Sequence, residues 1–228
     1  MRAPLSVIIP TRNAANIVGP ALASLFEGVQ GSLIRELIIS DGESTDQIAK
    51  VADAAGANLV LSAPGRGRQL AAGAEAASGS WFLFLHADTQ LEAGWSDAVR
   101  RHMDKGTGRA AHFRLKFRST GPCAAWVAGW ANFRSRAFQL PYGDQGLLIS
   151  RSLYEEVGGY PDYPLMEDVA IAERLKGNLE ELSSHAFTSA RRQEEIGWLA
   201  SGASNLSILL KFKAGVSPDR LAAQYYRK

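Results

Sequence analysis

The chain has 228 residues and a formal net charge of +2; 46% of its residues are hydrophobic and 21% are charged. This balance is typical of an ordinary globular protein, and the length allows one well-buried domain or at most two small ones. No apolar run is long enough to span a bilayer, no signal peptide is expected, and the single Cys123 excludes an intramolecular disulfide. We therefore expect a cytoplasmic protein.

Strand-like and helix-like segments alternate through the first hundred residues. Strands are expected at 5–9, 36–39, 57–61 and 81–85, and helices at 15–26, 44–55, 68–77 and 93–103. Ser44 or Thr45 is the expected cap of the second helix. Strands that alternate with helices of this length predict βαβ units, so the fold class is α/β with a mostly parallel central sheet flanked by helices.

The second half of the chain is less regular. Strands are expected at 111–117 (with an antiparallel neighbour as one option), 146–149 and 182–187, and helices at 124–138, 151–157, 166–175, 196–213 and 218–226. This pattern adds a small antiparallel element and C-terminal helices to the parallel sheet. No repeat or linker is visible, so a single domain is expected over 1–228.

The most informative stretch is Trp81–Thr89, with the sequence WFLFLHADT. Its continuous apolar run predicts a strand that is buried on both faces. Ligands of open α/β sheets sit beyond the carboxyl ends of the strands, which is where His86 and Asp88 follow. These two side chains are separated by one residue, so both are candidate ligands of a divalent metal.

Two other strand ends carry candidate binding residues. Asp41 follows the second strand on a glycine turn and could bind a ribose or base edge, although Asp-Gly is also a common turn. Arg66 and Arg68 lie in a Gly-rich turn at a helix start, which suits a diphosphate, or else a solvent-exposed loop. The absence of Walker and GxGxxG patterns argues against a P-loop enzyme and a dinucleotide dehydrogenase.

The segment from Arg100 to Arg136 is strongly basic and rich in aromatic residues. It holds nine Lys or Arg and one acidic residue, a local net charge of +8. Such a stretch could meet anionic lipid, a phosphate-bearing substrate or nucleic acid, or it could be a solvated face beside core aromatics. Trp126, Trp130 and Phe133 have helical spacing, so they form either an interfacial patch or part of the core.

Four stretches together resemble family 2 glycosyltransferases with the GT-A fold, over nearly the whole chain: SVIIPTRNAANI, ELIISDGESTD, APGRGRQLAAGAEAASGSWFLFLHADT and PYGDQGLLISRSLYEEVGGYPDYPLMEDVAIAERLK. The phrases LFLHADT, GDQG, MEDVAIAERL and TSARR are most similar to a bacterial subgroup described as arsenosugar-type or radical-SAM-associated glycosyltransferases. The resemblance implies a nucleotide-binding half at about 1–90, an acceptor half at about 91–190 and C-terminal helices at about 191–228.

The resemblance also implies a role for each residue that matches a family motif. The residues around the nucleotide would be Pro10, Thr11, Asp41, Arg66, Arg68 and Ala87. The metal would be held by Asp88, with His86 and His185 as further candidates. Asp168 would be the general base, with Glu167 as its neighbour in the same motif, and Asp144 and Gln145 would line the acceptor side.

These roles agree with the chemistry of sugar transfer. The leaving diphosphate gains charge, which a divalent cation such as Mn²⁺ or Mg²⁺ neutralises, while the acceptor must lose a proton to a carboxylate. The expected reaction is metal-dependent and inverting. It is also expected to be non-processive, since no QxxRW sequence follows the ED motif. The acceptor could be a small metabolite or a polyprenyl phosphate at the inner face of a membrane, and in the second case the protein would contact the membrane peripherally. Nucleic acid is not expected as a partner. The alternatives are a nucleotidyltransferase acting on a sugar phosphate and a non-catalytic nucleotide-sugar binding protein.

Overall fold

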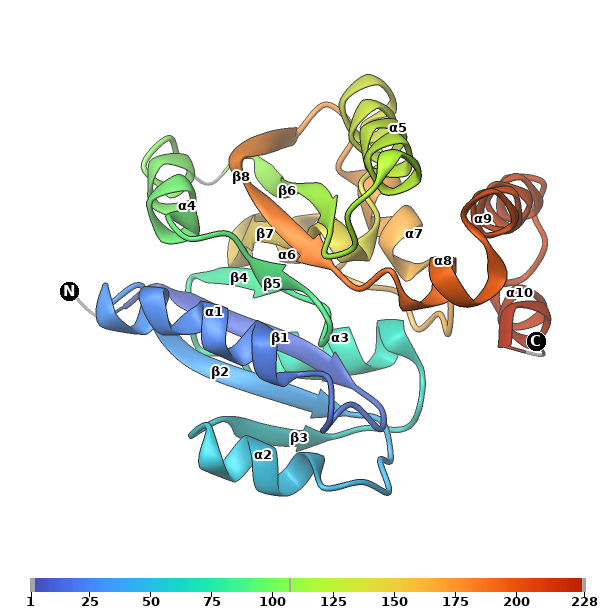
Figure 1. The fold of residues 1–228 in the computed structure, drawn as a ribbon. Helices are drawn as coiled ribbons and strands as arrows, with labels where there is room; N and C mark the ends of the chain where they lie inside the picture. Colours follow the sequence, from blue (N-terminus) through green and yellow to red (C-terminus); the bar gives the residue numbers. More distant parts are fainter. Residues whose placement is uncertain (1–2, 107, 227–228) are drawn as a thin grey trace.

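One eight-stranded sheet runs through the structure, a computed structural model that describes residues 3–106 and 108–226. The strand order is β3-β2-β1-β4-β7-β6-β8-β5. Helices cover both of its faces (Figure 1). The sheet is mixed and mostly parallel where it begins, which confirms the α/β class and the GT-A arrangement expected for the family.

The first half of the chain builds the parallel part of the sheet. Its elements are β1 (Leu5–Thr11), α1 (Gly19–Gln30), β2 (Ile34–Asp41), α2 (Ile48–Ala54), β3 (Asn58–Leu61), α3 (Arg66–Ala76) and β4 (Trp81–Phe84). β1 pairs in parallel with both β2 and β4, and β2 pairs in parallel with β3. Val7 and Ile9 pack into one hydrophobic core and Ile8 into the other, because successive side chains of a strand point to opposite faces.

The second half adds the antiparallel element and the far edge. Its elements are β5 (Gln90–Leu91), α4 (Trp95–Met103), β6 (Ala110–Phe117), α5 (Pro122–Phe138), η1 (Gly143–Gln145), β7 (Leu147–Ser150), α6 (Arg151–Glu156), α7 (Glu167–Arg174) and β8 (Leu179–Thr188). β7 is antiparallel to both β4 and β6, whereas β6 and β8 are parallel. The antiparallel element expected from the sequence is therefore centred on β7.

Three helices follow the sheet: α8 (Arg191–Ile196), α9 (Trp198–Lys213) and α10 (Pro218–Tyr226). The helix expected over 196–213 is present as α9, which begins two residues later, whereas α8 was not expected. Gly197, whose φ of 89° is readily adopted by glycine, separates the two helices. Figure 1 shows these three helices at one side of the molecule, next to the ends of the central strands. Within the described ranges, no helix is long and apolar enough to cross a membrane.

The start of α2 differs from the sequence expectation. The helix begins at Ile48, and Ser44 does not cap it. The Ser44 hydroxyl instead donates to Asp41 Oδ1 at 2.5 Å, and the Ser44 N–H donates to Asp41 Oδ2 at 2.9 Å. Polar side chains after a strand often bond within their own turn in this way, which competes with helix formation.

Candidate active site

Two adjoining cavities open at the carboxyl ends of β1 and β4. The first, here called the β1 cavity, is lined by residues that include Pro10, Thr11, Gly65, Gln69, Ala87 and Tyr226. The second, here called the α7 cavity, is lined by residues that include Arg118, Tyr142, Asp144, Asp168, Asn205 and Tyr225. Ile17, Arg66, His86 and Asp88 belong to the walls of both cavities. A ligand that occupies both would pass these four residues.

The β1 cavity is held in shape by hydrogen bonds between strand ends. The buried Gln69 amide donates to the carbonyl of Thr11 at 2.6 Å and to the carbonyl of Ser40 at 3.0 Å, which ties α3 to both β1 and β2. Gly67 lets α3 lie directly on the neighbouring loop, because a Cβ there would come within 2.1 Å of the Pro161 carbonyl oxygen. The first turn of α3 is therefore fixed beside the cavity, where a helix N-terminus favours an anion.

His86 and Asp88 follow β4 in a tight turn, closed by the Thr89 N–H donating to the His86 carbonyl at 3.1 Å. Burial, together with the nearby Arg66 charge, lowers the pKa of His86 to about 3, so the imidazole is neutral at physiological pH. The ring fits closely against Gly143, where an added Cβ would lie 2.4 Å from His86 Nε2. A neutral imidazole retains a nitrogen lone pair for a ligand.

Asp88 is a carboxylate in a poorly solvated position. Burial raises its pKa, and the positive charges of Arg118 and Arg66 partly offset this effect. Arg118 also donates to the Asp88 backbone carbonyl at 3.0 Å. Across residues 3–106 and 108–226, no group of three or more His, Cys, Asp or Glu is arranged to hold a metal ion. The metal role expected for Asp88 and His86 therefore stays a prediction.

Arg66 and Glu167 form an ion pair between the first turns of α3 and α7. Their Nη1 and Oε1 atoms are 3.5 Å apart, and the Glu167 side chain is fully buried. Burial raises the pKa of Glu167 to about 7 although Arg66 opposes this. Burial opposes the charge on Arg66, yet the carboxylates of Glu167 and Asp168 raise its pKa above the ordinary value. The guanidinium therefore stays charged where the cavities meet.

Asp168 lies at the start of α7, after a sharp turn in which Met166 has a φ of 68°. The Gly143 N–H donates to Asp168 Oδ2 at 2.9 Å, and the Val169 N–H donates to Oδ1 at 2.7 Å. The side chain is half-buried and lines the α7 cavity. These two hydrogen bonds fix the carboxylate but leave further lone pairs that can accept a proton from a bound molecule.

Tyr142 and Asp144, on either side of Gly143, line the α7 cavity next to Asp168. Burial raises the pKa of Asp144 to about 6, which the charge of Arg134 opposes and that of Asp168 reinforces. The Arg134 guanidinium lies 3.5 Å from the centre of the Tyr142 ring. Burial also raises the pKa of Tyr142 to about 12, so its hydroxyl stays protonated and can donate a hydrogen bond.

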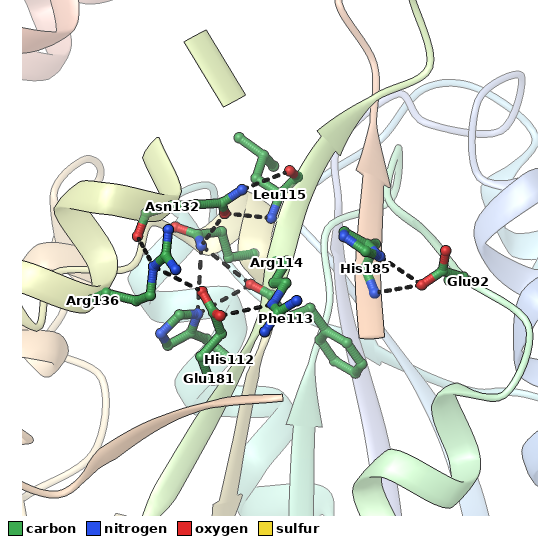
Figure 2. A network of polar contacts seen from close by, with 10 residues as sticks. Glu92, His112, Phe113, Arg114, Leu115, Asn132, Arg136, Glu181 and His185 are labelled. Atoms are coloured by element: carbon green, nitrogen blue, oxygen red, sulfur yellow. Dashed lines mark hydrogen bonds and ion pairs between the residues drawn. The ribbon is translucent and has the colours of Figure 1, made fainter. Parts of the chain in front are cut away.

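Four of the expected site residues do not line either cavity. His185 Nδ1 is 2.6 Å from Glu92 Oε2 and lines neither cavity (Figure 2). Arg68 Nη2 donates to Asp162 at 2.7 Å at the exposed surface. Asp41 is buried and accepts from Ser44 and from Thr11, so it lies directly behind Thr11, a wall residue of the β1 cavity.

Gln145 is the fourth of these residues. It is fully buried and accepts from the Ser135 hydroxyl at 2.6 Å, so it braces η1 against α5 rather than facing an acceptor. The expected residues that do line the cavities are Pro10, Thr11, Arg66, His86, Ala87, Asp88, Asp144 and Asp168.

Other cavity residues were not expected from the sequence. They include Arg118 at the end of β6, Gln69 in α3, Arg191 in α8, Asn205 in α9 and Tyr225 in α10. Gln69 and Arg118 stood within segments already marked as glycine-rich or basic. The residues of α8–α10 carry no local pattern that distinguishes them from any amphipathic helix.

Comparison with known proteins places the chain in a class. The family model described as "Glycosyl transferase family 2" matches residues 6–130, more than half of the chain. The chain therefore belongs to glycosyl transferase family 2. A "PGL/p-HBAD biosynthesis glycosyltransferase" of Mycobacterium bovis is 35% identical over 105 residues, which cover 40% of this chain and only 38% of that relative.

Solved structures share the fold at low sequence identity. Mannosyltransferase PcManGT from Pyrobaculum calidifontis, in complex with GDP-Man and Mn²⁺, is 17% identical with a TM-score of 0.67, over 99% of this chain and 70% of that one. S. aureus TarS in complex with UDP-GlcNAc is 18% identical with a TM-score of 0.60, over 81% of this chain and 58% of that one.

Proposed function

We propose that this glycosyltransferase transfers a sugar from a nucleotide-sugar donor to an acceptor hydroxyl or phosphate, in a metal-dependent, inverting and non-processive reaction. The observation that carries the proposal is the meeting of the two cavities at Arg66, His86 and Asp88. The nucleoside would occupy the β1 cavity and the diphosphate would lie at this junction. The sugar would then project into the α7 cavity, toward Asp168.

Arg66 is the residue best placed to bind the diphosphate. Its guanidinium carries a full charge, lies at the first residue of α3 and is held by the buried Glu167. A guanidinium fork pairs well with phosphate oxygens, and the helix N-terminus adds a favourable dipole. Glu167 would act as the residue that orients Arg66, because its side chain is fully buried.

Asp88 and His86 would hold the metal ion through one carboxylate and one neutral imidazole nitrogen. When bound, Mn²⁺ or Mg²⁺ would neutralise charge on the diphosphate. Two protein ligands suit such a cation, since Mg²⁺ in particular is held by few side chains together with phosphates and water. The complexes of the mannosyltransferase with GDP-Man and Mn²⁺ and of TarS with UDP-GlcNAc support both the donor class and the metal.

Asp168 would act as the general base. It lines the α7 cavity, on the far side of the junction where the diphosphate would lie, and so it can accept the proton of an attacking hydroxyl. Attack from the side opposite the leaving group inverts the sugar carbon. Asp144 and Tyr142 line the same cavity and would bind sugar or acceptor hydroxyls.

A donor screen with a matched pair of variants tests the proposal. The wild-type protein is incubated with UDP- and GDP-sugars, with Mn²⁺, Mg²⁺ or chelator, and nucleoside diphosphate release is measured. Asp168→Asn keeps the size of the side chain, and we expect turnover to fall about 10²–10⁴-fold while nucleotide affinity is retained. Asp162→Asn, at an exposed residue outside both cavities, should be unaffected. Normal turnover of Asp168→Asn would refute the assignment of the base.

A further inference from the structure

The outer face of α5 is an uncovered row of aromatic side chains. Trp126, Trp130, Phe133 and Phe138 are between 48% and 65% exposed. The rings of Trp130 and Phe133 lie 5.7 Å apart, and those of Phe133 and Phe138 lie 6.1 Å apart, so the aromatic residues touch one another. Alanines on the opposite face already bury α5 against the protein. The aromatic face is therefore not needed for the packing of the helix.

The neighbouring helix α9 is apolar on two opposite sides. Ser201 and Ile208 face the protein and are buried, whereas Leu199, Leu206 and Leu210 face outward and are between 53% and 77% exposed. These leucines recur at intervals of seven and four residues, which places them on one face. A surface helix of a globular protein normally presents polar residues there, so an apolar outer face marks an interaction surface.

The two outer faces belong to adjacent helices. The Phe117 and Trp198 rings pack at 5.0 Å, and Val127 of α5 and Trp198 of α9 pack against the same small hydrophobic core. Figure 1 shows α5 and α9 on the same side of the molecule, beyond the ends of β6 and β8. We call this region the α5–α9 apolar surface, formed by Trp126, Trp130, Phe133, Phe138, Leu199, Leu206 and Leu210.

Helices α5 and α9 themselves carry basic side chains and no acidic ones. No Asp or Glu occurs from residue 105 to 143 or from residue 196 to 218, whereas Arg118, Arg134, Arg136, Lys211 and Lys213 occur there. Arg136 of α5 is exposed and lies 3.7 Å from Glu181 Oε2, and Lys213 of α9 pairs with Glu173, so both helices present basic side chains at the surface. Exposed tryptophans suit the interface between lipid headgroups and acyl chains, and basic residues add attraction to anionic lipids.

We propose that the α5–α9 apolar surface docks peripherally on an anionic lipid bilayer. Docking through α9 would bring the α7 cavity close to the bilayer, because the inner residues Asn205 and Ile208 of this helix line that cavity. The bilayer would then lie against the outside of the helix that walls the proposed acceptor side. The lipid contact itself stands on the surface and its charge; only the supply of a lipid-borne acceptor rests on the proposed function.

Vesicle flotation of the purified protein tests the proposal without requiring activity. Vesicles of phosphatidylcholine, with and without added phosphatidylglycerol, are mixed with wild type and three double variants. Two variants alter the surface: Trp130→Gln with Phe133→Gln, and Leu206→Gln with Leu210→Gln. The third, Phe26→Gln with Leu61→Gln, is the matched control, since these side chains are 62% and 75% exposed on the distant α1 and β3.

We expect wild type and the control to float with the anionic vesicles and each surface variant to bind about tenfold more weakly or worse. Melting temperatures establish that the variants are folded. Failure of the wild type to float, or equal binding by all variants, would overturn the proposal. A concentration-dependent dimer in lipid-free solution, lost in the surface variants, would instead assign the surface to a second copy of the chain. A failure of sugar transfer would leave the flotation result intact.

Discussion

Gly143→Ala perturbs the site through a single methyl group. The position needs glycine because of close contact: the new Cβ would lie 2.4 Å from His86 Nε2 and 2.9 Å from its Cε1. Ordinary contact begins near 3.4 Å, so the imidazole must move by roughly 1 Å if the backbone holds. The backbone is constrained because the Gly143 N–H donates to Asp168 Oδ2.

The size of the His86 displacement sets the expected loss of activity and stability. A misplacement of about 1 Å in a catalytic constellation can reduce the rate about 10²-fold, and overpacking a well-packed position costs about 1–3 kcal/mol of stability. We therefore expect kcat/KM to fall about 10²-fold, with only a modest fall in melting temperature. The fall in kcat/KM should be caused by displacement of the His86 ring, because no other group lies as close to the added Cβ.

Nucleoside diphosphate release from the donor found in the screen measures the effect. Gly202→Ala is the matched control: its added Cβ has no heavy atom within 4 Å, and its activity should be unchanged. Combining Gly143→Ala with His86→Ala should cost no more than His86→Ala alone, because the ring that clashes is gone. Full activity of Gly143→Ala, or additive losses in the double variant, would refute this reasoning.

Asp88→Asn should abolish the gain in nucleoside diphosphate affinity that Mn²⁺ provides, as measured by calorimetry; an unchanged gain would remove Asp88 from the metal site. Arg66→Ala should raise the donor KM about tenfold or more, whereas Arg68→Ala should not, because Arg68 pairs with Asp162 outside the cavities. Asp144 binds its proton more tightly when folded, with the pKa raised from 3.8 to about 6. Its contribution to stability is therefore present at low pH and is lost as the pH rises through about 6. Relative to Asp144→Asn, wild type should lose up to about 3 kcal/mol over this range in chemical denaturation, and a flat difference would contradict the shift.

Local patterns were sufficient for most of the sheet. The apolar runs at Leu5–Thr11 and Trp81–Phe84 are buried parallel strands because no other local structure hides so many apolar side chains in so few residues. β5 was missed because Gln90–Leu91 has only two residues, too few for any periodicity. Its existence depends on β8, a strand about a hundred residues away in the chain, and no local signal reports such a partner.

The site was predictable where a residue directly follows an element. Asp88 lies in the turn after β4 and Asp168 is the second residue of α7, so these elements place both side chains at the cavities. Arg66 and Arg68 were not distinguished, because the helix was expected to start at Arg68. The helix starts at Arg66. Two residues along a helix correspond to a rotation of roughly 200° about its axis, so Arg66 and Arg68 point to nearly opposite sides and only one of them can face the cavities.

The alternation of side chains along a strand explains why His185 does not line either cavity. Thr188 lines the α7 cavity, and residues three apart on β8 point to opposite faces of the sheet, which sends His185 toward Glu92. The same alternation, applied once β8 had been placed, would have removed His185 from the metal site. The walls made by the C-terminal helices depend on packing between distant segments, which the sequence does not reveal locally.

The contribution of α8–α10 to the cavity walls separates chemistry from choice of substrate. Asp88 and Arg66 come from the stretch that the family model matches, residues 6–130. Asn205, Tyr225 and Tyr226, which close the cavities, come from helices beyond it and outside the sheet. Substitutions in these helices can reshape what the enzyme accepts without disturbing the reactive groups. Because Tyr226 lines the β1 cavity and Asn205 and Tyr225 line the α7 cavity, these helices are a natural place for laboratory evolution toward new donors as well as new acceptors.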